Sequence, residues 1–288
     1  MKFFSASSPA KVIFVILPGN PGKPGLYIEL MKYLHVNYNK QVDIYCIAYV
    51  GHDIPTSQVF DLGQQVEHSR KQVIQIRKDK PNAKIYLFGH SVGAYIALQL
   101  EQLADRLVYM FPSIDDFKST PNAKIWWPLF TPLFIHVFAS LVYLSSYLPS
   151  AFRQKIAMFA DPKLTEVQAQ AMTKEWDPRI IYNAGKIVQD EFEFITPLDL
   201  ARFDLISTNK APLIDKCYFI LSPFDDWCDI STYRKLATRW PGKLISRDKM
   251  GICLNGGIYL TDAKIPHAFC VGFNKEVADI IHTILPLY

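Results

Sequence analysis

The segment from Gly89 to Gly93 reads Gly-His-Ser-Val-Gly and contains a candidate nucleophile, Ser91. It follows an apolar run at 84–88 that predicts a strand, and it opens a stretch at 92–103 that predicts a helix. Glycine on both sides of the serine suits a turn too tight for a neighbouring Cβ, with a strained backbone that exposes the hydroxyl. The start of the helix supplies N–H groups for a developing oxyanion. The pattern therefore predicts a strand–turn–helix nucleophile elbow at Ser91.

A serine hydroxyl becomes a useful nucleophile when a histidine takes its proton and a carboxylate orients that histidine. In the α/β-hydrolase fold the three follow the chain order Ser, then Asp or Glu, then His. Five of the seven histidines precede any suitable acid, and His282 falls in the closing helix; the five are His35, His52, His68, His90 and His136. His267, in a loop just past the last predicted strand, is therefore the predicted base.

Three aspartates compete for the role of the acid in the loop after the predicted strand 217–221. The spacing from a short apolar position favours Asp225, and Asp226 is the alternative. Asp229 is better interpreted as a helix N-cap. Asp115 and Asp116, after the fourth strand, are an outside alternative because some members of this fold carry the acid there.

The loop after the first predicted strand reads Leu-Pro-Gly-Asn-Pro-Gly at 17–22. Hydrolases of this fold bind the oxyanion with one backbone N–H from this loop and one from the residue after the nucleophile. Those residues are Asn20 and Val92, since Pro21 has no N–H to donate. An ordinary glycine–proline turn is the alternative interpretation.

The remaining pattern alternates strands with helices, which predicts an α/β fold with a mostly parallel sheet covered by helices on both faces. The residues 1–288 are read as a single domain. The alternation breaks at about 114–211, which predicts an insertion over the carboxyl ends of the strands, where open α/β sheets bind ligands. We expect strands at 12–17, 42–50, 84–88, 107–111, 217–221 and 258–260, and helices at 26–38, 61–78, 92–103 and 278–285.

Composition excludes some classes of function. The formal net charge is +4, and the basic residues are scattered rather than clustered, so the sequence does not favour a nucleic-acid partner. The five cysteines form no Cys-x-x-Cys pair, so disulfide and metal frameworks are not expected and a reducing compartment is favoured; they are Cys46, Cys217, Cys228, Cys253 and Cys270. The N-terminus lacks the apolar core of a signal peptide.

The segment 125–152 contains no Lys, Arg, Asp or Glu. Pro132 and Pro149 bracket a predicted helix at 133–148, whose length of about 24 Å is short of a hydrocarbon core of about 30 Å. A single crossing would also place Ser91 and His267 on opposite sides of the membrane. We therefore expect a shallow or re-entrant, monotopic contact with a lipid surface. A lid helix packed on the protein itself is the alternative, and either arrangement forms a hydrophobic entrance for an acyl chain.

Aromatic side chains in this segment are the candidate lipid contacts. Tryptophan and tyrosine suit a membrane–water interface, and phenylalanine suits the apolar side of one. The candidates are Trp126, Trp127, Phe130, Phe134, Phe138, Tyr143 and Tyr147.

Short motifs spread in order over nearly the whole chain resemble the lipid droplet-associated hydrolases. The most specific are Pro-Gly-Asn-Pro-Gly at 18–22 and Ile-Pro-His-Ala-Phe at 265–269. The others are at 51–52, 65–68, 89–95, 111–114, 119–122 and 225–228. The resemblance implies an α/β hydrolase at the cytosolic face of lipid droplets and the endoplasmic reticulum. It links the chain to the turnover of cholesterol esters and other neutral lipids, in a family whose catalytic activity is weak or disputed.

Carried over residue by residue, the resemblance makes Ser91 the nucleophile, Asp225 the acid and His267 the base. The sequence departs from the family at Asp229, where relatives have proline. It also begins almost at the strand before the oxyanion loop, so we expect the usual first two strands to be missing and a sheet edge to be exposed.

The sequence thus predicts a serine hydrolase that cleaves carboxylic esters of neutral lipids through an acyl-enzyme, without a metal or organic cofactor. One alternative is a lipid droplet-binding protein with little or no catalysis. Another is a thioesterase or an esterase for small esters. The oligomeric state does not follow from the sequence.

Overall fold

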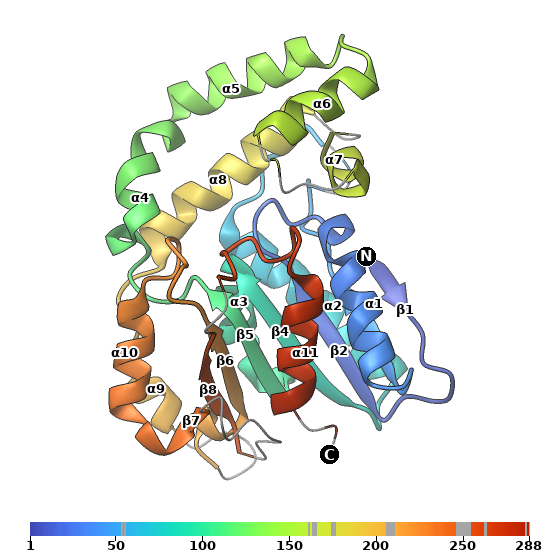
Figure 1. Ribbon diagram of the computed structural model, residues 1–288, viewed down its shortest axis with the longest axis vertical. Coiled ribbons are helices and arrows are strands. Elements are labelled where there is room, and N and C mark those ends of the chain that lie inside the picture. Colours follow the sequence, from blue (N-terminus) through green and yellow to red (C-terminus); the bar gives the residue numbers. More distant parts are fainter. Residues whose placement is uncertain are drawn as a thin grey trace.

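In the computed structural model, which describes residues 1–52, 54, 56–160, 162, 166–173, 177–205, 211–245, 255–261, 264–285 and 287, the apolar runs form one eight-stranded sheet (Figure 1). The order across the sheet is β1-β3-β2-β4-β5-β6-β8-β7. Neighbouring strands are parallel, except that β1 is antiparallel to β3. The strands are β1 Lys2–Phe4, β2 Val12–Leu17, β3 Val42–Cys46, β4 Lys84–Ser91, β5 Arg106–Pro112, β6 Cys217–Leu221, β7 Leu244–Ile245 and β8 Gly257–Leu260.

Strand β2 shows why these runs form a sheet buried on both faces. All six of its residues are buried. Because side chains alternate along a strand, Ile13, Val15 and Leu17 join one hydrophobic cluster, and the other three residues join the cluster on the opposite face. A continuous apolar run is therefore the pattern expected of a central parallel strand.

Helices cover both faces of the sheet. Residues of α1 (Ile28–Asn37) and α11 (Asn274–Ile284) belong to the cluster on one face, where these two helices pack on each other. Residues of α2 (Leu62–Asp79), α3 (Val92–Gln99) and α10 (Ile230–Arg239) belong to the cluster on the other face, as does Phe203 of the short α9 (Ala201–Asp204). The predicted parallel α/β fold is therefore confirmed.

Most of the chain between β5 and β6, up to the end of α8, forms a layer over the carboxyl edge of the sheet (Figure 1). It contains α4 Pro121–Trp126, α5 Pro132–Ser145, α6 Ser150–Ala160, α7 Glu166–Thr173 and α8 Pro178–Phe194. Helix α8 lies next to the sheet and α5 lies outside it. The two pack closely, because a Cβ on Gly185 of α8 would lie 2.7 Å from Cδ1 of Ile135 of α5. His136 Nδ1 also lies 2.8 Å from the Tyr182 hydroxyl.

Strand β1 corrects one expectation. We expected the usual first two strands to be missing and a sheet edge to be exposed. One strand, β1, does precede β2: its residues Lys2, Phe3 and Phe4 pair with Cys46, Tyr45 and Ile44 of β3 and cover that part of the edge. The Phe3 ring stacks on Tyr45 with centroids 4.5 Å apart. Three residues are too few to display the alternation by which a strand is recognised in a sequence.

Some helix and strand boundaries in the structure differ from the predicted ones. Strand β3 ends at Cys46 rather than at position 50, and the two-residue β7 was not predicted. Helix α5 starts at Pro132, where Thr131 caps it, and ends at Ser145 rather than at position 148. The cysteines at 46, 217, 228 and 270 are buried and form no disulfide within the described part of the chain, and Cys253 lies outside the described residues.

Candidate active site

Ser91 lies at the junction of β4 and α3 in a strained backbone conformation, with φ 55° and ψ −128°. A non-glycine residue with positive φ is uncommon, and this one points the side chain out of the turn. A Cβ on Gly89 would lie 2.4 Å from Cα of Ala94, and one on Gly93 would lie 2.1 Å from the Leu17 carbonyl oxygen. Both glycines are therefore required by close backbone contacts, and the predicted elbow is present.

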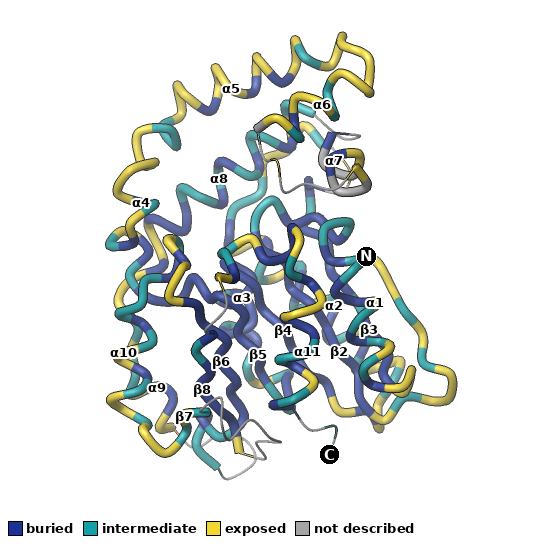
Figure 2. The backbone as a smooth tube through the Cα atoms, in the orientation of Figure 1, coloured by how far each residue is buried: buried dark blue, intermediate teal, exposed yellow. Residues whose placement is uncertain are grey.

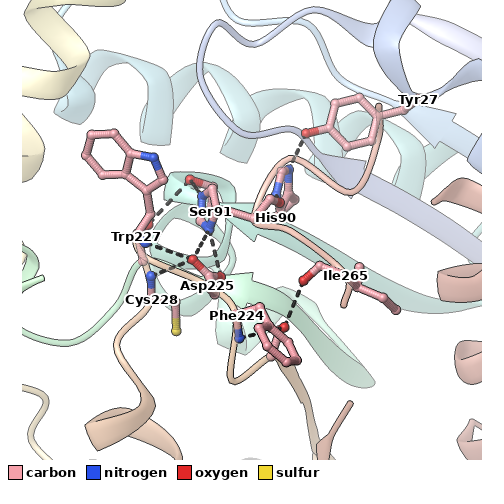
Figure 3. A network of polar contacts seen from close by, with 11 residues as sticks. Tyr27, His90, Ser91, Phe224, Asp225, Trp227, Cys228 and Ile265 are labelled. Atoms are coloured by element: carbon pink, nitrogen blue, oxygen red, sulfur yellow. Dashed lines mark hydrogen bonds and ion pairs between the residues drawn. The ribbon is translucent and has the colours of Figure 1, made fainter. Parts of the chain in front are cut away.

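His267 lies between Ser91 and Asp225 at hydrogen-bond distance from both. Figure 3 labels these two partners, Ser91 and Asp225. Its Nε2 is 2.8 Å from Ser91 Oγ, and its Nδ1 is 2.8 Å from Asp225 Oδ2 and 2.9 Å from Oδ1. In this arrangement Nδ1–H donates to the carboxylate and Nε2 accepts from the serine hydroxyl. Such a chain of contacts is the geometry in which a base can activate a serine.

Backbone hydrogen bonds hold the carboxylate of Asp225 in place. Its Oδ1 accepts hydrogen bonds from the N–H groups of Trp227 and Cys228, each at 2.8 Å. The Asp225 side chain is fully buried, whereas 15% of the His267 side chain is exposed. The acid is thus fixed in the interior, and the site opens to its surroundings at the histidine.

The rival aspartates have other partners. Asp229 caps α10, where its side chain accepts from Ser231 N at 2.7 Å, so its interpretation as an N-cap is confirmed. Asp115 is paired with Lys235 Nζ at 2.7 Å and accepts from Thr232 Oγ1 at 3.1 Å. It therefore anchors α10 to the end of β5 rather than orienting His267.

The other two candidate acids, Asp226 and Asp116, form hydrogen bonds through their backbones. The carbonyl of Asp226 accepts from Asn122 N at 3.0 Å, and the N–H of Asp116 donates to the Thr196 carbonyl at 3.1 Å. Of the candidate acids, Asp225 is the one whose carboxylate lies at hydrogen-bond distance from His267.

The predicted oxyanion loop lies directly against the nucleophile. A Cβ on Gly19 would lie 2.9 Å from Cβ of Ser91. The Gly19 N–H is already engaged, since it donates to the Tyr27 hydroxyl at 2.8 Å. The side-chain amide of Asn20 donates to the Ala184 carbonyl of α8 at 2.8 Å. The backbone N–H groups of Asn20 and Val92 remain the candidate oxyanion donors.

Sequence reasoning did not assign a place in the site to Ser113 at the end of β5. Its hydroxyl lies 3.3 Å from Ser91 Oγ, and its N–H donates to the Ser91 carbonyl at 3.1 Å. The segment 111–114 stood out as a family motif, but its contact with Ser91 depends on the pairing of β4 with β5. That pairing is a property of the sheet and has no local signal in the sequence.

The predicted lipid contacts lie on the outer layer of helices, whose exposed face is visible in Figure 2. Phe130 is half-buried and packs near Phe192, with ring centroids 6.3 Å apart. The other six are exposed, between 38% for Phe134 and 71% for Tyr147; the remaining four are Trp126, Trp127, Phe138 and Tyr143.

Among the described residues, no single helix has the length and apolar character needed to cross a membrane. The segments Pro121–Phe130 and Pro132–Ser145 reach that threshold only as a pair, and they are bent by 76° relative to each other.

Comparison with known proteins identifies a family for this chain. A family model described as lipid-droplet associated hydrolase matches residues 10–270. The lipid droplet-associated hydrolase of Gallus gallus is 26% identical over 294 residues, which cover 94% of this chain and 83% of that protein.

Two solved structures share the fold. The thioesterase domain from the curacin biosynthetic pathway has a TM-score of 0.56 and 11% identity, covering 97% of this chain and 93% of that one. A lipase-esterase related protein from Clostridium acetobutylicum has a TM-score of 0.55 and 15% identity, covering 99% of both chains. The chain therefore has the α/β-hydrolase fold and belongs to the family of lipid-droplet associated hydrolases.

Proposed function

We propose that this protein is a serine hydrolase that cleaves carboxylic esters of neutral lipids, cholesterol esters among them, at the surface of lipid droplets. The observation that carries the proposal is the unbroken chain of contacts from Asp225 through His267 to Ser91 Oγ. A buried carboxylate, a partly exposed imidazole and a strained serine are the three parts that acyl transfer requires.

In the first half of the reaction, His267 Nε2 takes the proton of Ser91 as Oγ attacks the ester carbonyl carbon. The carbonyl oxygen becomes an oxyanion, which the N–H groups of Asn20 and Val92 hold. Asp225 stabilises the imidazolium through Nδ1–H. The bond to the alcohol oxygen then breaks, and His267 gives its proton to that oxygen, so the alcohol leaves and an acyl-serine remains.

In the second half, water replaces the alcohol. His267 takes a proton from the water, whose oxygen attacks the acyl carbon. The bond between that carbon and Ser91 Oγ breaks, and His267 returns the proton to the serine. The fatty acid leaves and the enzyme is restored, with no group needed beyond the chain itself.

The exposed apolar residues of the outer helices indicate that the reaction takes place at a lipid surface. Helix α5 exposes Leu133 (75%), Leu141 (57%) and Leu144 (61%) together with its aromatic residues. The buried members of the same helix, Ile135, Ala139 and Val142, face inward. An exposed apolar stripe of this kind is unusual for a protein surface that meets water alone, and it suits a droplet monolayer or the cytosolic face of the endoplasmic reticulum.

Turnover of an emulsified ester tests the proposal. Purified protein is incubated with droplets of cholesteryl oleate coated with phosphatidylcholine, and released fatty acid is measured for wild type, Ser91→Ala and the neighbouring Ser113→Ala. We expect release by wild type and its loss in Ser91→Ala, by a factor of about 10³ or more.

Equal release by wild type and Ser91→Ala would contradict the catalytic role of Ser91. Turnover of a short thioester or a small soluble ester in place of the droplet ester would contradict the neutral lipid substrate while preserving the mechanism.

A further inference from the structure

His90, the residue before the nucleophile, is buried with 4% exposure and is not used by the mechanism above. Its two ring nitrogens face two different loops. Nδ1 lies 2.5 Å from the Tyr27 hydroxyl, a contact drawn in Figure 3. Nε2 lies 2.8 Å from the backbone carbonyl oxygen of His267. The Tyr27 hydroxyl in turn accepts the N–H of Gly19 at 2.8 Å.

The proton positions in this chain follow from its end at His267 and from the neutrality of the ring. The His267 carbonyl can only accept, so His90 carries a proton on Nε2. Burial, and next the charge of the nearby His267, lower the pKa of His90 to about 3, so the ring is neutral at neutral pH. Nδ1 therefore has no proton and accepts that of the Tyr27 hydroxyl, whose oxygen accepts the Gly19 N–H.

Packing holds the same ring in place. The His90 ring lies 4.7 Å from the ring of Phe269, 5.8 Å from that of Tyr27 and 6.4 Å from that of Phe111, all at steep angles. Phe269 belongs to the same loop as His267. Hydrogen bonds and packing thus join the same two loops through one side chain.

The two loops come from opposite ends of the chain. The oxyanion loop follows β2, and the His267 loop follows β8. The oxyanion is bound by the first loop and the base is carried by the second, while the serine stands between them. A displacement of about 1 Å at such a site can cost about 10²-fold in rate.

We propose that His90, with Tyr27, is a positioning residue that ties the oxyanion loop to the loop of the catalytic base. The inference rests on the proposed function, since it assigns a role in that same reaction. His90 touches neither the ester nor Ser91 Oγ, so its effect on the rate passes through Gly19 and His267.

Four variants test the proposal in the full-length protein, with a soluble p-nitrophenyl ester. Tyr27→Phe and His90→Ala remove the hydrogen-bond chain. His90→Gln keeps an N–H near the position of Nε2 and so preserves the contact with the His267 carbonyl. Tyr38→Phe is the matched control, because the buried Tyr38 hydroxyl donates to the carbonyls of Ile281 and Leu285, away from the site.

We expect kcat per folded molecule to fall roughly 10-fold in Tyr27→Phe and 10- to 100-fold in His90→Ala, with KM within about twofold of wild type. His90→Gln should recover part of the loss, and Tyr38→Phe should keep the wild-type kcat. A role confined to stability would lower the melting temperature in all of these variants and leave kcat per folded molecule unchanged, which would overturn the proposal.

A second readout does not need turnover. The proton between His267 Nδ1 and Asp225 gives a far-downfield resonance in the proton NMR spectrum, and its exchange with water reports how well the base is held. Faster exchange in Tyr27→Phe and His90→Ala, but not in Tyr38→Phe, is the expected result. Equal exchange rates in wild type and in these three variants would overturn the positioning role. An inactive wild type with this resonance intact would count against the proposed function alone.

Discussion

At the scale of the residue, Asp225 and Asp226 are neighbours in one loop with different environments. Both carboxylate oxygens of Asp225 approach His267 Nδ1, and two backbone N–H groups hold Oδ1. Asp226 contributes its backbone carbonyl to Asn122. The orientation of the base therefore depends on the first aspartate.

Replacing each carboxylate with an amide distinguishes the role of Asp225 from that of Asp226. Asp225→Asn should lower kcat for a soluble ester by about 10³- to 10⁴-fold, because the amide no longer favours the His267 tautomer with its proton on Nδ1. Asp226→Asn, the matched control, should stay within about twofold of wild type. The measurement is initial-rate kinetics at equal folded concentration, and equal losses in the two variants would reassign the acid.

Residue order allowed Ser91, Asp225 and His267 to be nominated from the sequence, because the nucleophile elbow has a local signature and the fold imposes the order of the other two. The sequence favoured Asp225 as the acid and kept Asp226 as the alternative. The contacts of His90 with Tyr27 and of Ser113 with Ser91 had no such signature. They join residues 63 and 22 positions apart, and they depend on how loops meet after the sheet has formed.

At the scale of the element, the outer face of α5 is predicted to bind lipid. Phe138 and Leu141 are 47% and 57% exposed. Burying the exposed half of each side chain in lipid gains about 0.7–1.5 kcal/mol, which is half the gain for a fully exposed one. Replacing both with serine should weaken binding to phospholipid-coated triolein droplets by at least about 10-fold, while hydrolysis of a soluble ester is preserved.

Flotation of the droplets measures that binding. The control is Val36→Ser, which removes an equally exposed apolar side chain (62%) from α1, on the body of the protein. Droplet binding by the α5 double variant at the wild-type level would contradict the role of this helix.

Helix α8 contains a buried carboxyl group that makes stability depend on pH. Burial, and next the charge of Asp190, raise the pKa of Glu191 to about 8 from its usual value of 4.5. Between these two values the folded chain holds a proton that the unfolded chain releases. The free energy of unfolding therefore decreases as the pH rises from about 4.5 to 8, and it changes little from this group above that range.

Glu191→Gln removes the titrating group. The variant should gain melting temperature relative to wild type at pH 8.5 and much less at pH 5, with each kcal/mol corresponding to roughly 2–4 °C. Thermal unfolding followed by circular dichroism measures the difference. Glu193→Gln, an exposed neighbour on the same helix, is the control and should show the same difference at both pH values. A gain in melting temperature for Glu191→Gln that is equal at both pH values would contradict the raised pKa of Glu191.

Elements with a strong apolar signal were predictable, and short or edge elements were not. The six residues of β2 are buried throughout, so they read as a strand from sequence alone. Strands β1 and β7, of three and two residues, owe their existence to pairing with β3 and β8. Tertiary contacts of this kind decide short strands more than the preferences of their own residues.

At the scale of the whole molecule, the parallel sheet explains how residues 176 positions apart meet. The nucleophile is the last residue of β4, the acid follows β6 and the base follows β8, all at the carboxyl edge. The alternation of strands and helices was enough to predict that edge and the segment that crosses it. The arrangement of α5 outside α8 was not predictable, because it depends on the fit of Ile135 against Gly185.

The whole proposed reaction depends on the activation of Ser91 by the base beside it. Labelling with a fluorophosphonate probe, which reacts with activated serines, measures this activation in wild type, Ser91→Ala and His267→Ala with lipid droplets present. We expect labelling of wild type, no labelling of Ser91→Ala, and a loss of at least about 10²-fold in the labelling rate of His267→Ala. A folded wild type that does not react, or labelling that persists in Ser91→Ala, would contradict the activation of Ser91.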